Sequence, residues 1–335
     1  MAPSPRYNTE PPEKLRPGEC TAVRRFLRYA PDAMPGLSYR ILNVFTRGAD
    51  TLSGNPLCVF EDGASLDDRT MQALARQFNL SETTFVLPST RASARVRIFT
   101  PSYEMPFAGH PTLGTAHVCR ALGLGGNELT LEMTAGVIPV AAEKDRWTLQ
   151  ANAPQWREVA EPREAIAAML GLEARDIGER PLWVSTGREQ LIIPLKSEEA
   201  VRRARPQPER LARFTSDAGA SMAYVFAPRD AGRSRDPSPL RTDAGARAGA
   251  APEPLIARFF FPQGPAVLED PATGSATANL GGWCIALERK LPCSFEIAQG
   301  EQTGRPSLLY LEVAAERRVR VSGNVIELGR GSLAI

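Results

Sequence analysis

Two stretches of the chain repeat one arrangement of residue types, and this repeat limits the folds that the sequence can adopt. Residues 97–118, RIFTPSYEMPFAGHPTLGTAHV, and residues 258–280, RFFFPQGPAVLEDPATGSATANL, both begin with an aromatic-containing strand that ends in proline. A loop follows, and a glycine with a polar neighbour then opens an apolar helix. The repeat predicts two halves of similar build, whose equivalent loops face each other across a cleft.

The length agrees with two halves, because 335 residues are more than one typical core organises. Strands alternate with helices from residue 38 onward, which is typical of an α/β protein. Apolar residues at helical spacing predict a helix over 67–79, with Ser65 or Asp67 as its cap. A second helix is predicted over 164–172.

Two segments lack the apolar residues that a core requires. Residues 1–37 contain no apolar region of the kind found in a secretory signal, and we expect a disordered extension. Arginines there would suit a transit peptide, whereas the glutamates among them argue against it. Residues 229–254 consist mostly of Arg, Ala, Gly, Pro, Asp and Ser. We expect a flexible surface insertion there rather than a basic binding loop, because aspartates dilute its charge.

The composition argues against several classes of partner and cofactor. The net charge is +2, from 40 basic and 38 acidic residues, so we expect no nucleic-acid or membrane partner. The five cysteines form no C-x-x-C pair and there are only two histidines, which makes a structural zinc site hard to assemble. Scattered thiols indicate a reducing compartment and a cytoplasmic location. No glycine motif for phosphates or dinucleotides is present, so no nucleotide cofactor is expected.

His110 lies in the sequence FAGHPTLG, between a glycine and a proline at a predicted helix start. Pro111 suits the first helical position, where its missing N–H is harmless. The positive end of a helix disfavours imidazolium, so we expect a neutral ring that can accept or donate one proton. The alternative is a histidine that simply bonds to a backbone carbonyl. The other histidine, His117, falls within the helix, and we expect a structural role for it.

Two carboxylates are candidates for proton transfer. Glu82 enters an apolar strand in SETTFVLP, which is compatible with a buried acid or base and also with an ordinary salt-bridge partner. Glu269 and Asp270 are adjacent in an extended stretch, so their side chains should point to opposite faces. Asp270 precedes Pro271 and the glycine step, and we expect it to be the one that faces the cleft.

The two predicted helix starts are candidate anion sites. The first N–H groups of a helix lack intrahelical partners and its N-terminal end is positive, so each start can hold a substrate carboxylate. The alternative for the second helix is that Thr273 or Ser275 caps it.

Six motifs follow one another along the chain: SGNPLCVF, SETTFVLP, VRIFTP with MPFAGHPTLG, STGREQLIIPL, EDPATGSA and GRPS. In this order they resemble the PhzF-like phenazine-biosynthesis proteins, over roughly residues 38–335. PFAGHPTLG and EDPATGSA together are highly specific, whereas STGREQL departs from the more apolar form usual in that family.

The resemblance implies a diaminopimelate-epimerase-like fold. Such a fold has two similar α/β domains, each a curled mixed sheet or barrel around a central helix, with the active site between them. The first domain would span residues 38–155 and the second 156–323. The C-terminal strand, about 324–335, would return to the first domain.

The resemblance also implies a function and its residues. It implies a cofactor-independent isomerase that moves a proton between carbons of a dihydro-hydroxyanthranilate-like carboxylate, in phenazine-type or other secondary metabolism. Its motifs assign catalysis to Glu82, His110, Asp270 and Ser275, and substrate binding to Ser81, Asn55, Gly109, Thr273 and Gly274.

Two further readings stay open beside the isomerase. One is an amino-acid epimerase or lyase on the same fold, although no cysteine falls in either helix-start motif, which disfavours a thiol-based racemase. Another is a family member that binds a metabolite or a protein without catalysis. Relatives are often homodimers, and the residues themselves do not decide the oligomeric state.

Overall fold

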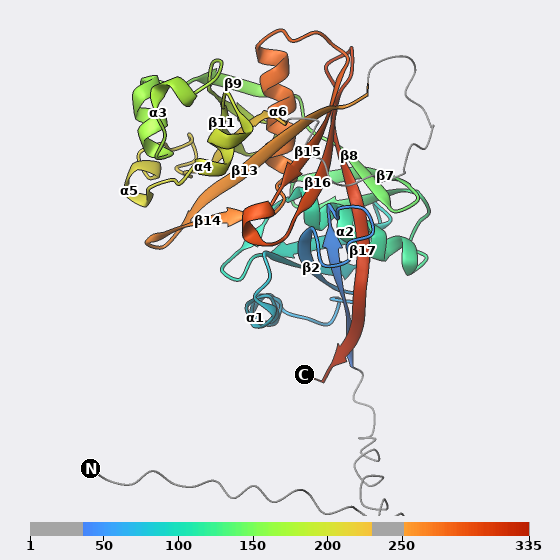
Figure 1. The fold of residues 1–335 in the computed structure, drawn as a ribbon. Coiled ribbons are helices and arrows are strands. Elements are labelled where there is room, and N and C mark those ends of the chain that lie inside the picture. The colour runs from blue at the N-terminus through green and yellow to red at the C-terminus, as the bar shows by residue number, and fades with distance from the viewer. Residues whose placement is uncertain (1–35, 230–250, 335) are drawn as a thin grey trace, which may run out of the picture. The chain divides into compact units, whose positions relative to one another are not determined.

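Two buried helices, α2 (Gly109–Ala121) and α6 (Gly274–Ala286), are the axes of the fold in the computed structural model, which describes residues 36–229 and 251–334 (Figure 1). Most residues of both helices are buried, because their side chains are largely small or apolar on every side. Strands therefore have to enclose both helices. Among the described residues, no helix is long and apolar enough to span a membrane.

The strands of the first half close into an eight-stranded barrel around α2. Around the ring they are β1 (Leu37–Val44), β2 (Asn55–Phe60), β3 (Glu82–Leu87), β4 (Ala94–Phe99), β6 (Glu128–Met133), β7 (Gly136–Glu143), β8 (Arg146–Gln150) and β17 (Val319–Leu333), which pairs back with β1. The short β5 (Glu104–Met105) pairs antiparallel with the end of β4. Helix α1 (Asp68–Phe78) packs outside the barrel against β3 and β4.

The second half curls in the same way around α6. Its strands run in the order β9 (Gln155–Glu158), β10 (Leu182–Ser185), β11 (Glu189–Pro194), β12 (Ala223–Pro228), β13 (Glu253–Gln263), β15 (Cys293–Gln299), β16 (Ser307–Val313) and β17, with β14 (Ala266–Asp270) beside β13. Helices α3 (Arg163–Met169), α4 (Glu198–Arg203) and α5 (Pro208–Leu211) belong to this half.

The two halves repeat one pattern of strand pairing, which confirms the predicted fold of two similar curled sheets around central helices. The parallel pairs are β2–β3 and β4–β6 in the first half, and β11–β12 and β13–β15 in the second. The neighbouring pairs are antiparallel in both. In each half one strand, β4 or β13, lies between a parallel and an antiparallel neighbour, and the central helix begins after the strand that follows it, β5 or β14.

Strand β17 belongs to both halves. Val319–Ser322 pairs with β16 and Arg320–Asn324 with β8, whereas Val325–Leu333 pairs with β1. In Figure 1 this strand, drawn in red, extends from the sheet of the second half along the first. Because one continuous backbone is hydrogen-bonded to both sheets, the two curls are held in one body.

A single apolar cluster fills the space inside the curls and includes side chains of α2 and α6, such as Leu113 and Leu280. Complete burial of one such leucine contributes about 1.5–3 kcal/mol. Gly114 allows α2 to approach the sheet closely, because a Cβ there would lie 2.4 Å from Leu57 Cδ2 and 2.9 Å from Val44 Cγ2. The central helix is thus placed by close packing as well as by burial.

The predicted helices are present with shifted ends. The helix expected over 67–79 is α1, and Asp67 caps it by accepting from the Thr70 N–H at 2.8 Å. The helix expected over 164–172 is α3, which ends at Met169. Pro111 is the third residue of α2 and not the first, because the chain already enters the helix at Gly109 after the extended Ala108.

Most of the predicted N-terminal extension, 1–37, and most of the predicted insertion lie outside the described residues, and Leu37 needs correction because it already belongs to β1. One edge of the insertion needs correction, since Glu253 and Pro254 already belong to β13 and pair with Phe295 and Glu296 of β15. Backbone pairing extends the strand although these side chains are exposed. Across the insertion, the Arg229 N–H donates to the Pro254 carbonyl at 2.9 Å.

This bond predicts that residues 231–250 can be replaced by a short Gly-Ser turn. The variant should stay soluble and melt within about 2 °C of the parent, because Arg229 and Pro254, on the two sides of the insertion, are already hydrogen-bonded. Thermal melting followed by circular dichroism measures the change. As a control, a deletion extended through Pro254 should melt distinctly lower, since it removes pairing between β13 and β15. Equal destabilisation by both deletions would contradict the prediction.

Candidate active site

The N-termini of the two central helices meet. A Cβ built on Gly109 would lie 3.6 Å from Gly274 Cα, and one on Gly274 would lie 3.8 Å from Gly109 Cα. Neither α2, which follows Ala108, nor α6, which follows Thr273, receives a side-chain cap. First-turn N–H groups without intrahelical partners and two positive helix ends are therefore concentrated at one place. Such a place favours a bound anion, for example a carboxylate.

Glu82 and His110 lie beside this junction. Glu82 is the first residue of β3 and His110 the second residue of α2, and Glu82 Oε2 lies 3.4 Å from His110 Nε2. Their side chains are 16% and 6% exposed. Within the described residues, neither of these two atoms has a hydrogen-bond partner. Two buried, titratable atoms that face each other without hydrogen bonds are available to a substrate.

Burial favours the neutral form of both groups. It raises the pKa of Glu82 to about 8, to which nearby Asp270 adds and which Arg188 opposes. It lowers the pKa of His110 to about 3, although a backbone hydrogen bond with Pro56 opposes the shift. A proline backbone can only accept, so His110 donates to that carbonyl and keeps an unprotonated Nε2 toward Glu82. The neutral ring and the carbonyl bond, considered as alternatives in the sequence, occur together.

Asp270 is the last residue of β14, in the second half. Its Oδ1 accepts from Asn55 Nδ2 at 2.9 Å and its Oδ2 from Thr273 Oγ1 at 2.5 Å. Asn55 also donates to the Ala272 carbonyl at 3.0 Å and accepts from Ser81 Oγ at 3.2 Å. Burial raises the pKa of Asp270 to about 6, against the lowering effect of its two hydrogen bonds. Asn55, from the first half, thus holds the acidic loop of the second.

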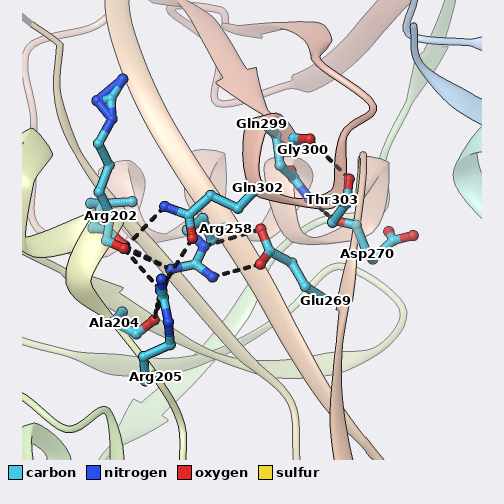
Figure 2. Close-up of polar contacts among 11 residues, drawn as sticks. Arg202, Ala204, Arg205, Arg258, Glu269, Asp270, Gln299, Gly300, Gln302 and Thr303 are labelled. Carbon is cyan, nitrogen blue, oxygen red and sulfur yellow. Dashed lines mark hydrogen bonds and ion pairs between the residues drawn. The ribbon is translucent and has the colours of Figure 1, made fainter. Parts of the chain in front are cut away.

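Glu269 and Asp270 point to opposite faces, as their adjacency predicts. Glu269 Oε2 accepts from Arg258 Nη2 at 2.6 Å and Oε1 from Arg258 Nε at 3.0 Å, whereas Asp270 faces away from this pair (Figure 2). Arg258 also donates to the Ala204 carbonyl at the end of α4. This pair anchors β14 and leaves Asp270 directed to the junction.

The alternative that Thr273 or Ser275 merely caps α6 is wrong. Thr273 directs its hydroxyl to Asp270, and Ser275 Oγ accepts from Gln190 Nε2 at 3.1 Å. Both hydroxyls are used across the loop, so the helix end stays open. The structure therefore brings together all nine residues that the sequence assigns to the site, from β2, β3, the two helix starts and the loop after β14.

Four neighbouring residues were not identified from the sequence. Asn279 donates to Gln190, which in turn donates to Ser275. Gln299 donates to the Asp270 carbonyl at 2.9 Å, and the charge of Arg188 lowers the pKa of Glu82. Asn279, a fully buried amide within the largely apolar α6, was a signal for such a contact. The polar form of STGREQL was a second signal.

The remaining histidine and the cysteines lie elsewhere. His117 accepts from Trp147 Nε1 at 3.3 Å, as a structural residue would. The cysteines of the described chain are unpaired, and none occupies a helix start: they are Cys58, Cys119, Cys284 and Cys293. Within the described residues, no three His, Cys, Asp or Glu side chains are grouped as a metal site requires.

Comparison with known proteins identifies the family of the chain. The profile of the phenazine biosynthesis-like protein family, PhzC-PhzF, matches residues 42–331, which include both helix starts and all nine site residues. The protein belongs to this family. The PhzF-like chain is 34% identical to an uncharacterised isomerase of Pasteurella multocida, over 89% of this chain and 94% of the relative. It is likewise 34% identical to the trans-2,3-dihydro-3-hydroxyanthranilate isomerase of Pseudomonas aeruginosa, over 88% of this chain and 98% of that one.

A crystal structure of the same family shares the fold. The PhzF-family protein of Bacillus anthracis superposes with a TM-score of 0.74 at 24% identity, over 90% of this chain and 100% of that one. The fold is thus α+β, as in that structure, and the relatives that are 34% identical show that the protein is an isomerase.

The raised pKa of Glu82 predicts how stability changes with pH. Between pH 4.5 and about 8 the folded protein keeps the Glu82 proton and the unfolded chain has lost it, so stability falls as pH rises through this range. Glu82→Gln removes this pH-dependent loss of stability, because the amide does not titrate. Its melting temperature relative to the parent should therefore increase from pH 5 to pH 9, measured by scanning calorimetry. Glu128→Gln, at an exposed position, is the matched control; an equal pH trend in both variants would refute the assignment.

Proposed function

We propose that this isomerase moves a proton between carbon atoms of a small carboxylate-bearing metabolite by general acid–base catalysis, using its own side chains. The observation that carries the proposal is the Glu82–His110 pair. Two buried atoms 3.4 Å apart, without hydrogen-bond partners in the described chain, lie beside the meeting helix ends. A proton donor and acceptor next to an anion site is the arrangement that such a reaction needs.

The helix ends would hold the substrate carboxylate. Gly109 and Gly274 open the two helices, and the absence of side chains there lets a ligand approach the backbone N–H groups. When a proton leaves a carbon conjugated to the carboxylate, negative charge spreads onto the carboxylate oxygens. The same N–H groups then stabilise the charge that develops, without having to rearrange.

In its ionised form, which is accessible at a pH near its pKa of about 8, Glu82 would take the proton from one carbon and return it to another. A group with a pKa of about 8 exchanges a proton readily near neutral pH, which is the range that a general acid–base catalyst needs. His110 Nε2, unprotonated and adjacent, can accept a hydrogen bond from the Glu82 acid. Asp270, with the lower pKa of about 6, would remain largely a carboxylate and position an electropositive part of the substrate.

The substrate class comes from the relatives. The trans-2,3-dihydro-3-hydroxyanthranilate isomerase of Pseudomonas aeruginosa supports a dihydro-hydroxyanthranilate-like carboxylate, and with it a role in phenazine-type or other secondary metabolism. A thiol-dependent epimerase is disfavoured, because the described cysteines lie away from the two helix starts.

The direct test uses trans-2,3-dihydro-3-hydroxyanthranilate as substrate. Incubated with the full chain in deuterated water, it should give an isomer that NMR distinguishes from the starting material, and mass spectrometry should report deuterium gained from solvent. A product in which every double bond keeps its position and one stereocentre is inverted would support an epimerase instead. Absence of both conversion and exchange would leave a binding protein and refute the proposal for this substrate.

Glu82→Gln should slow this conversion by roughly 10²–10⁴-fold, because the amide keeps the shape but cannot take the proton. Glu82→Asp should keep part of the activity, since the carboxylate survives one methylene shorter. Turnover measured beside substrate affinity by calorimetry separates chemistry from binding. Normal turnover of Glu82→Gln would identify Glu82 as a mere structural partner and direct attention to Asp270.

A further inference from the structure

The side-chain amides of Asn279 and Gln190 connect the β10–β11 turn with Ser275, and the Asn279 amide has only one possible orientation. The Thr186 N–H donates to Asn279 Oδ1 at 2.8 Å, and Asn279 Nδ2 donates to the Arg188 carbonyl at 2.9 Å. A backbone N–H can only donate and a backbone carbonyl can only accept. These two bonds therefore decide which end of the Asn279 carboxamide is oxygen and which is nitrogen.

The orientation of Asn279 determines that of Gln190. Asn279 Nδ2 has a second hydrogen, which it donates to Gln190 Oε1 at 2.8 Å. With its oxygen toward Asn279, Gln190 presents Nε2 to Ser275 Oγ at 3.1 Å. Gln190 and Asn279 are 1% and 0% exposed, so water does not compete for these groups. The direction of the hydrogen bond at Ser275 is thus defined, and the serine accepts.

An accepting serine keeps its only proton for another partner. Among the described residues, Ser275 Oγ makes no bond as a donor, and the Ser275 backbone nitrogen lies 3.7 Å from where a Cβ on Gly109 would be. Ser275 therefore lies at the junction of the two helix ends and carries an O–H for which the described residues offer no acceptor.

We propose that Gln190, oriented by Asn279, is a positioning residue that turns the Ser275 O–H toward the substrate and makes it a hydrogen-bond donor to the negative charge that develops there. This inference rests on the proposed function of the same site. It assigns roles to a β11 residue and an α6 residue outside the helix-start motifs.

The carboxylates of Asp270 and Glu189 are engaged with other donors. Asp270 accepts from Asn55 and Thr273. Glu189, adjacent to Gln190 in the chain, accepts from Arg157 Nε and Nη2 at 2.9 Å each. Gln190 is the donor that Ser275 Oγ has among the described residues, so the Ser275 proton points away from Gln190.

Neutron diffraction from crystals of the perdeuterated full chain tests the geometry without any substrate. The expected density places deuterium on Gln190 Nε2 toward Ser275 and turns the Ser275 O–D away from Gln190. A Ser275 O–D directed at Gln190 would overturn the proposal, even if the enzyme turned over dihydro-hydroxyanthranilate normally. The expected density without any turnover would refute only the proposed function.

Gln190→Glu tests the consequence for catalysis. When the new carboxyl is ionised it accepts from Ser275, so turnover of trans-2,3-dihydro-3-hydroxyanthranilate should fall roughly 10- to 150-fold, as expected when a hydrogen bond to a charged group is lost. Acidification protonates that carboxyl and should restore the donor, giving the variant an extra ionisation in its pH–rate profile. Gln190→Met, which has no donor or acceptor, should lose activity without the extra ionisation.

Ser275→Ala supplies the reference in which Glu82 and Asp270 still titrate. In that background Gln190→Glu should add no pH-dependent loss, because no hydroxyl remains to be turned. If the extra ionisation persists without Ser275, the new charge acts directly on the site and the proposed role of Gln190 is wrong. Wild-type turnover of Gln190→Glu at alkaline pH would contradict it equally.

Discussion

The end-to-end meeting of α2 and α6 is the constraint on which the rest of the structure depends. Two positive helix ends repel each other, and their first N–H groups have no intrahelical partners. Only tight enclosure can hold them together, with a Cβ position on Gly109 3.6 Å from Gly274 Cα. Acidic side chains and a bound anionic ligand at the junction offset the electrostatic cost of this repulsion. The same junction therefore requires the enclosing strands and provides the site for an anion.

The enclosure comes from strands that are paired across the whole body. Strand β17 is hydrogen-bonded to β16 in one half and to β8 and β1 in the other, so neither curl can move without disturbing a shared backbone. At the junction itself Asn55 bonds to Asp270 and to the Ala272 carbonyl, which links the halves directly beside the site. Rigid elements thus position every polar group that the chemistry requires.

Burial shifts the pKa values of the titratable groups by different amounts, which gives them different protonation states. Glu82 has few compensating contacts and its pKa rises to about 8, whereas Asp270 accepts two hydrogen bonds and its pKa rises only to about 6. Near neutral pH one group therefore holds a proton and the other holds a charge. His110 remains neutral because its ring is buried and only one nitrogen is hydrogen-bonded. Unequal environments, rather than different residue types, separate the acid from the carboxylate.

The sequence by itself determined the repeat, the two helix starts and the opposite directions of Glu269 and Asp270. Those features are local or repeat along the chain, so spacing and residue type are enough to identify them. The set of residues around the site came from the resemblance of the motifs to a family. Only the tertiary structure decided that Thr273 and Ser275 leave the helix uncapped, and that Gln190, which accepts from Asn279, donates to Ser275. Gln190 and Ser275 are 85 residues apart in the chain, and a hydrogen bond over that separation depends on how strands curl around a helix. No local pattern contains that information, because it is set by packing.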